Sequence, residues 1–193
     1  MRVDARRNRE HLLTTARAVI AEQGPEASLN EIARQAGVGP GTLYRHFPTR
    51  QALLAAVFQD RVETLCARAD DLLTHTSPDE ALDLWSRDVL AHALTDGGMS
   101  TSMTRDPAEP GFDCHAAMRS AATGLLSRAQ REGRTRRDVD VEDFFQLVTG
   151  VALAASELPG GLERADHLLA VTLAGLRDRD RGGTAGWRSG ADG

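Results

Sequence analysis

The sequence predicts an all-α protein with three short helices near the N-terminus and a larger helical region behind them. Three observations indicate this fold class. Apolar residues recur at steps of three and four along most of the 193 residues, no stretch alternates with the two-residue period of a strand, and glycine or proline separates the helical stretches. We find no internal repeat.

The first domain is expected over residues 1–48 as a loose arm followed by three helices. The first helix has one apolar side and ends at Gln23-Gly24. In the second helix, Ser28 and Glu31 fit the capping-box pattern, in which each side chain accepts a hydrogen bond from a free backbone amide at the helix start. Gly37 suits the left-handed position that ends such a helix.

The third helix begins at Pro40, where the missing proline amide costs nothing. We expect Leu43 and Phe47 to face inward. The side chains expected on or near the exposed side are Thr42, Tyr44, Arg45 and His46. Two short helices joined by a turn that contains glycine form a helix-turn-helix, which sets its second helix into the major groove of DNA. The sequence therefore predicts a protein that binds double-stranded DNA.

Residues 36–47, Ala-Gly-Val-Gly-Pro-Gly-Thr-Leu-Tyr-Arg-His-Phe, resemble the signature of the tetracycline-repressor (TetR) family of transcriptional regulators. The resemblance covers about the first quarter of the chain, and beyond residue 75 only helical character and length fit. It departs from the family at Gly39, where serine is usual, and at Arg50, where lysine is usual. The resemblance implies that phosphate is contacted by Ser28, Thr42, Tyr44, His46 and Arg50. It implies that the residues nearest to base edges are Gly39, Pro40, Gly41 and Arg45.

The distribution of charge is consistent with DNA binding. The net charge of the chain is −5, but residues 1–50 hold eight arginines against five acidic residues, which makes them +3 and the remainder −8. A basic domain joined to an acidic one orients a protein on DNA. The acidic remainder favours a cationic or neutral lipophilic ligand over an anion.

Several other classes of protein are disfavoured. No run approaches the about 18 apolar residues of a membrane helix, and the charged N-terminus lacks the apolar segment of a signal peptide. Cys66 and Cys114 suit a reducing cytoplasm and are expected to be packed thiols. His92 and the Cys114-His115 pair lack a third metal ligand at suitable spacing, so neither metal nor cofactor is expected. No catalytic motif is present, which argues against an enzyme.

The second domain is expected over residues 49–176. Its first helix, 49–73, links it to the DNA-binding domain and carries a continuous apolar stripe, formed by Leu54, Phe58, Val62, Leu65, Ala69 and Leu72. Further helices are expected at 79–94, at 114–132, from 140 or 141 to 158, and at 162–176. Residues 96–112 read as a loop, and residues 177–193 as a disordered tail.

The last two helices are apolar over most of their circumference, which predicts cover on several sides. A second copy of the chain supplies such cover, and the family resemblance implies that this helix pair meets its copy across a two-fold axis. The residues expected at the dimer interface are Phe144, Val148, Val151, Ala152, Ala155, Leu162, Leu169 and Leu173. The alternative is that the pair is interior core.

The resemblance also implies a ligand pocket in the second domain, so that a small molecule releases a homodimeric repressor from a palindromic operator. The candidate lining residues are Trp85, His92, Met99, Met103, Phe112, Met118 and Phe145. Each of them can instead be ordinary core. A DNA-binding protein that acts without a ligand or through a protein partner remains the alternative function.

Overall fold

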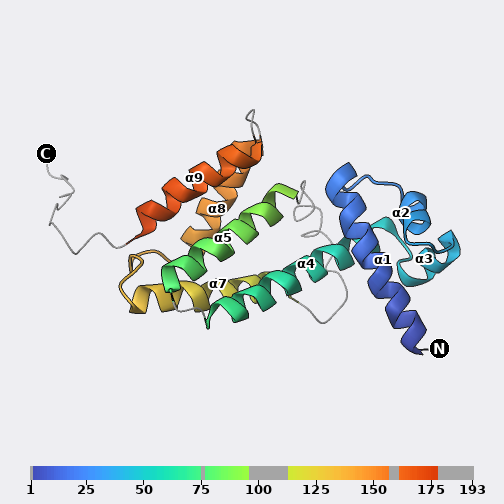
Figure 1. Cartoon of the computed structure of the whole chain (residues 1–193), viewed down its shortest axis with the longest axis horizontal. Coiled ribbons are helices and arrows are strands. Elements are labelled where there is room, and N and C mark those ends of the chain that lie inside the picture. The colour runs from blue at the N-terminus through green and yellow to red at the C-terminus, as the bar shows by residue number, and fades with distance from the viewer. Residues whose placement is uncertain (1, 75–76, 96–112, 157–160, 178–193) are drawn as a thin grey trace, which may run out of the picture.

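The computed structural model describes residues 2–74, 77–95, 113–156 and 161–177, apart from the side chains of residues 2–6 and of Leu162. Within these residues the chain forms eight helices: α1 (Arg2–Gln23), α2 (Leu29–Gln35), α3 (Pro40–His46), α4 (Arg50–Leu72), α5 (Pro78–Thr95), α7 (Cys114–Arg131), α8 (Val141–Ser156) and α9 (Gly161–Leu176). Figure 1 shows α1, α2 and α3 at one end of the molecule and α5, α7, α8 and α9 at the other, with α4 running between them. We call the first group the head and the second group the body.

The all-α fold class is confirmed for the described residues, and the helices lie within a residue or two of their expected positions. One expectation is wrong: in place of a loose N-terminal arm, α1 begins at Arg2 and runs unbroken to Gln23. The expected loop at 96–112 and residues 178–193 of the expected tail lie outside the described residues. Arg177, the first residue of the expected disordered tail at 177–193, is described, and its guanidinium lies 2.8 Å from the Asp83 carboxylate of α5.

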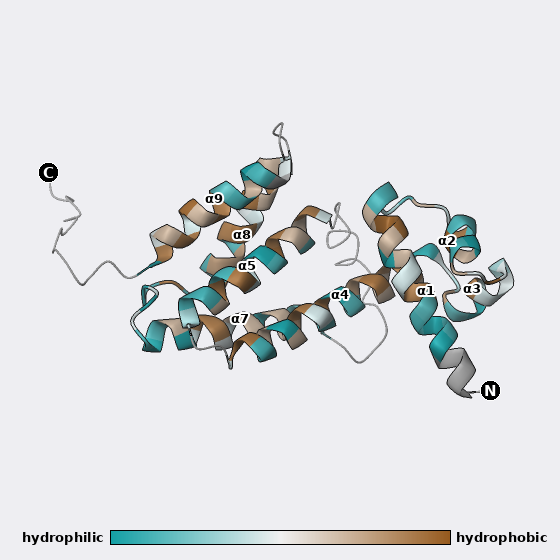
Figure 2. Cartoon of the chain, in the orientation of Figure 1, coloured by the Kyte–Doolittle hydropathy of each residue, from teal (hydrophilic) through white to brown (hydrophobic). Residues whose placement is uncertain are grey.

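Two clusters of buried apolar side chains hold the structure together, one in the head and one in the body. α4 belongs to both of them. Its first turns contribute Leu53 and Val57 to the head cluster, and its last turns contribute Ala69 and Leu72 to the body cluster. Figure 2 shows brown, apolar segments on α4 both beside α1 and at its far end. A tilt of α4 therefore changes how the head sits on the body.

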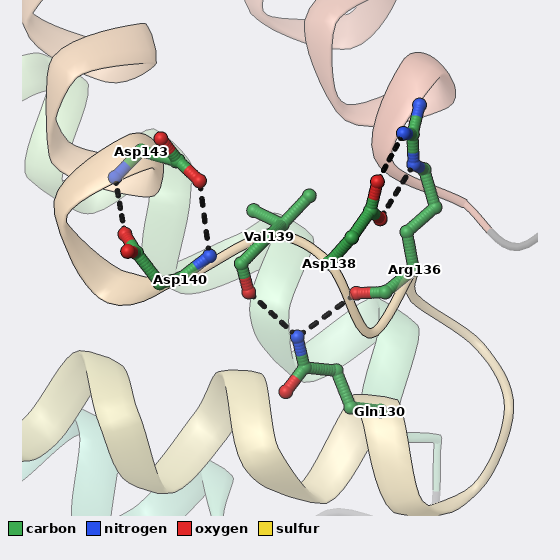
Figure 3. Close-up of polar contacts among 6 residues, drawn as sticks. All are labelled: Gln130, Arg136, Asp138, Val139, Asp140 and Asp143. Carbon is green, nitrogen blue, oxygen red and sulfur yellow. Dashed lines mark hydrogen bonds and ion pairs between the residues drawn. The ribbon is translucent and has the colours of Figure 1, made fainter.

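The connection between α7 and α8 is held by local hydrogen bonds (Figure 3). Gln130, near the end of α7, donates its side-chain amide to the backbone carbonyls of Arg136 and Val139, at 2.8 Å each. Asp140 and Asp143 cap α8, because the carboxylate of each accepts a hydrogen bond from the backbone amide of the other, at 2.8 and 3.1 Å. These contacts fix where α8 starts and hence which of its sides faces α5.

Most of the residues expected at the dimer interface are buried within a single chain. Seven of them are at most 9% exposed in a single chain and belong to the body core: Phe144, Val148, Val151, Ala152, Ala155, Leu169 and Leu173. The side chain of Leu162 is not described. The large apolar side chains that α8 and α9 leave exposed are Leu147, Leu153 and Val171, at 39, 67 and 59%. Apolar residues surround most of both helices, so the sequence pattern did not reveal which side packs inward.

Candidate nucleic-acid interface

The turn between α2 and α3 has the geometry that its sequence predicts. Gly37 has a φ of +65°, which favours glycine. Its amide donates to the carbonyl of Arg34 at 3.1 Å, and the amide of Val38 donates to the carbonyl of Ala33 at 3.0 Å. This pair of bonds closes the end of a helix in the manner of a Schellman motif. The turn thus fixes the angle at which α3 leaves α2.

The expected capping box at the start of α2 is absent. Ser28 occupies the N-cap position with extended backbone angles, but its hydroxyl makes no capping bond. The Glu31 carboxylate accepts instead from the Arg34 guanidinium, at 2.8 and 2.5 Å, and from the Gln35 amide at 2.8 Å. These hydrogen bonds, that from Arg34 first, lower the pKa of Glu31 to about 2. The Ser28 hydroxyl remains on the exposed surface of the head.

The hydrogen bonds of Arg34 and Gln35 to the Glu31 carboxylate predict a low pKa for Glu31. The pKa of Glu31 in an NMR titration of the side-chain carboxyl is expected near 2, against its usual value of 4.5. A pKa that is lower in the folded chain contributes stability that is complete above the usual value and is lost as the pH falls through about 2. The variant Arg34→Gln should return the pKa of Glu31 toward 4.5. A pKa near 4.5 in the unmodified protein would contradict this arrangement.

α3 presents its residues as the sequence predicts. Leu43 and Phe47 are 1 and 2% exposed and belong to the head core. The guanidinium of Arg9 on α1 lies over the Phe47 ring, 5.4 Å from its centroid, and fastens the end of α3 to α1. The outward residues are exposed or half-buried: Gly39, Pro40, Gly41, Thr42, Tyr44, Arg45 and His46. Apart from the adjoining residues and the backbone of α3 itself, no described atom lies within 4 Å of where a Cβ would stand on Gly39 or Gly41, so the front of α3 is open to an approaching molecule.

Arg50 has a structural partner that its sequence position did not reveal. Its Nη1 donates to the carbonyls of Pro25 and Ala27, at 2.9 and 2.7 Å, and the side chain is half-buried. These bonds tie the start of α4 to the connection between α1 and α2. A guanidinium has five N–H donors, so the other donors of Arg50 can still reach a phosphate.

Among the residues expected to line a ligand pocket, the four that the structure describes divide between the body core and a groove. Trp85 is completely buried in the body core, where its indole N–H donates to the Leu65 carbonyl at 2.9 Å. Met118 and Phe145 are half-buried and pack against the same core. His92 lines a groove of about 460 Å³ between α1, α4 and α5, and its ring lies 5.4 Å from the Phe58 ring. Met99, Met103 and Phe112 lie outside the described residues.

The groove at His92 is lined mainly by residues that the sequence reasoning missed, including Arg17, Arg61 and Arg68. They come from α1 and α4, and only the fold brings them beside α5. The one available signal was the spacing of Arg61 and Arg68, which are seven residues apart on α4 and therefore share a helix face.

The described residues include no group of three His, Cys, Asp or Glu side chains placed to hold a metal ion. Burial raises the pKa of both Cys66 and Cys114, which keeps these thiols protonated at neutral pH. None of the helices described is long and apolar enough to cross a membrane.

Two family models match the chain. The one described as "Bacterial regulatory proteins, tetR family" matches residues 12–57, and the one described as "Transcriptional regulator SbtR-like, C-terminal domain" matches residues 77–178, more than half of the chain. The matched segments together cover the head from residue 12 onward, the start of α4, and the body.

Solved and curated proteins agree with these matches. The structure of a TetR transcriptional regulator from Streptomyces coelicolor is 37% identical, with a TM-score of 0.74 over 89% of this chain and 99% of its own. The structure of RolR, in complex with its ligand resorcinol, is 25% identical, with a TM-score of 0.57 over 91% of this chain and 90% of its own. A curated helix-turn-helix transcriptional regulator from Staphylococcus aureus is 35% identical over 79 residues, which are 39% of this chain and 41% of that protein.

The family and these relatives are transcriptional regulators and not enzymes. The helix-turn-helix geometry, the two family models and the close structural relative lead to one assignment. The chain belongs to the TetR family of DNA-binding transcriptional regulators.

Proposed function

We propose that the chain is a repressor that binds a palindromic operator as a homodimer in the cytoplasm and is released by a small-molecule ligand. The observation that carries this proposal is the exposed front of α3, held rigidly by the buried side chains of Leu43 and Phe47. A helix presented in this way fits the major groove. The resorcinol complex of RolR supports a small molecule as the releasing signal.

The proposed contacts divide into two sets. Phosphate contacts position the head, and contacts in the groove read the sequence. The phosphate set is Ser28, Thr42, Tyr44, His46 and Arg50, and the set nearest to base edges is Gly39, Pro40, Gly41 and Arg45. Two glycines and a proline offer few hydrogen bonds to bases. Thymine methyl groups against Pro40 and Thr42, and a guanine bound by Arg45, are therefore the expected means of readout.

Tyr44 tests the phosphate set. It is the most exposed aromatic side chain that the structure describes in the head, at 47%, and its hydroxyl is available to a phosphate oxygen. Tyr44→Phe is expected to weaken binding to every DNA sequence about ten- to a hundredfold, because one hydrogen bond to a charged group is lost. Fluorescence anisotropy with the operator and with two mutated operators measures the effect. A change in the order of preference among the three duplexes would show that Tyr44 reads bases.

Arg50 is expected to act mainly by positioning the head. Arg50→Ala should lower the free energy of unfolding by about 1–3 kcal/mol, because two carbonyls of the connection before α2 lose a charged donor. Urea unfolding measures this, and Arg50→Lys is the control that keeps the charge. The dependence of DNA affinity on salt concentration tests the alternative, in which Arg50 only contacts phosphate. In that case Arg50→Ala would leave the free energy of unfolding unchanged and would reduce the slope of log affinity against log salt concentration by about one per head.

A homodimer follows from the size of the recognition element. One short helix reads few bases, whereas two-fold partners read two half-sites about one helical turn apart. The exposed sides of α8 and α9 suit such a contact, since Leu147, Leu153 and Val171 stand beside small residues that allow close approach. Those small exposed residues are Gly150, Ala154, Ala170, Ala174 and Gly175.

DNase footprinting on the intergenic DNA beside the gene of this protein tests the regulatory role. Protection of a palindromic stretch that overlaps a promoter is expected. A folded protein that gives only uniform, sequence-tolerant protection would instead favour the ligand-independent alternative. A protein partner would be indicated if protection appeared in a cell extract and not with the purified chain.

A further inference from the structure

The first turns of α1 project beyond the head core. Leu12 is the first residue of α1 in this core, so residues 2–11 precede it and span about 15 Å of helix. Figure 1 shows these turns extending past α2 and α3. The projection is a surface of the head that its own core does not account for.

One side of α1 changes character where the helix leaves the head core. Positions at alternating steps of four and three form a single line along this side: Arg2, Arg6, Arg9, Leu13, Ala16 and Ile20. The last three side chains are at most 6% exposed and belong to the head core. The first three positions all carry arginine, and we call them the arginine stripe. The side of α1 that meets apolar partners within the head is therefore suited to an anionic partner beyond it.

The projection holds most of the positive charge of the head. Residues 1–10 contain four arginines against Asp4 and Glu10, which gives +2 of the +3 of residues 1–50. Asp4 falls on the side of α1 opposite to the arginine stripe, since it is two residues from Arg2 and from Arg6. The acidic residues of the projection therefore do not interrupt the stripe.

Arg9 connects the arginine stripe to the recognition helix. Its guanidinium lies over the ring of Phe47, the residue that caps the C-terminal end of α3. The Arg9 side chain is exposed, and no carboxylate among the described residues forms an ion pair with it. A guanidinium that stacks through its face keeps the N–H donors at its edge for another acceptor. Arg9 is therefore a positive charge held in place beside α3 with donors to spare.

We propose that Arg9, together with the rest of the arginine stripe, binds the phosphate backbone of DNA beside the groove that α3 enters. The proposal rests on the proposed function, because α3 must lie in the major groove to bring α1 to the DNA. That groove is about 12 Å wide and is bordered on both sides by phosphates, so an element packed against the end of α3 stands next to one of these borders. Guanidinium groups bind phosphate oxygens with two parallel hydrogen bonds. The stripe positions the head and reads no bases.

The dependence of operator affinity on salt concentration tests this contact in the full chain. The slope of log affinity against log salt concentration reports the number of phosphates that the protein neutralises. Arg9→Gln should reduce this slope by about 0.9 for each head, or by about two for a dimer. The ratio of wild-type to variant affinity should then fall about tenfold between about 50 and 200 mM salt. The order of preference among the operator and two mutated operators should stay the same, and a changed order would overturn the phosphate contact.

Three further variants separate a phosphate contact from other effects of the change. Arg9→Lys keeps the charge and should keep the wild-type slope. Arg6→Gln leaves Arg9 on Phe47 and should reduce the slope as Arg9→Gln does. Arg7→Gln removes the same charge from an exposed position on the opposite side of α1 and should leave the slope unchanged.

The outcomes distinguish this inference from the proposed function. A wild-type slope in Arg9→Gln, or an equal reduction in Arg7→Gln, would overturn the contact, because then either no phosphate is lost or only overall charge matters. A reduction in Arg9→Gln that Arg6→Gln does not share would also overturn it, since loosening of α3 from α1 explains that pattern. Operator binding by the wild-type chain together with any of these results refutes this inference alone. A wild-type chain that binds no specific duplex refutes the regulatory function.

Discussion

Val171→Asp is expected to separate the two copies of the chain and to reduce operator binding to the level of non-specific DNA. Val171 is 59% exposed on α9, beside Ala170 and Ala174. In the proposed dimer a carboxylate at this position is buried against the partner without a counter-charge, which costs about 3–5 kcal/mol. Each separated copy keeps one head and reads one half-site. Loss of specificity lowers the affinity for the operator about a thousandfold.

Analytical ultracentrifugation measures whether the variant is monomeric or dimeric, and fluorescence anisotropy measures its affinity for the operator. Thr123→Asp introduces the same charge at an exposed position of α7, outside the α8–α9 pair, and should leave both the dimer and the affinity unchanged. A Val171→Asp protein that stays dimeric would place the two-fold contact elsewhere. A monomeric variant with full operator affinity would contradict the need for two heads.

Trp85→Ala is expected to lower the free energy of unfolding of the body by about 3–5 kcal/mol. The Trp85 side chain is completely buried, stacks on Phe144 at 6.0 Å between centroids, and meets the edge of Phe145 at 6.4 Å. It also donates to the Leu65 carbonyl on α4. Removing it opens a cavity between α4, α5 and α8. The body then loses one of the contacts that hold α5 against the linking helix.

Urea unfolding followed by circular dichroism gives the value, at one fixed protein concentration because dimerisation adds to stability. Trp85→Phe keeps an aromatic ring and loses the donor, so it should cost about 1 kcal/mol beyond the change in volume. If Trp85→Ala lowered the free energy of unfolding by less than about 1 kcal/mol, the packing of Trp85 would not be a main source of stability of the body core.

Local signals made much of the fold predictable. Helix positions followed from apolar spacing, and the end of α2 followed from Gly37, whose positive φ is a property of the backbone at that residue alone. The inward positions of Leu43 and Phe47 followed from their spacing on a short amphipathic helix. Each of these signals lies within a few residues of the feature that it predicts.

Features that depend on distant parts of the chain were not predictable in the same way. The carbonyl partners of Arg50 lie more than twenty residues earlier in the chain. The buried side of α8 is set by its packing on α5. Because apolar residues surround most of this helix, its sequence does not indicate which side faces the core. The Arg17–Asp60 pair joins α1 to α4, and the net charge of a domain says nothing of such local contacts.

Selection of binding sites from a pool of random DNA duplexes, with the purified wild-type chain, tests the central claim most directly. The predicted result is enrichment of an inverted repeat whose half-site centres lie about one helical turn, or a multiple of it, apart. Enrichment of a single asymmetric motif, or no enrichment by a folded protein that still binds DNA, would contradict the account of a two-headed, sequence-specific regulator.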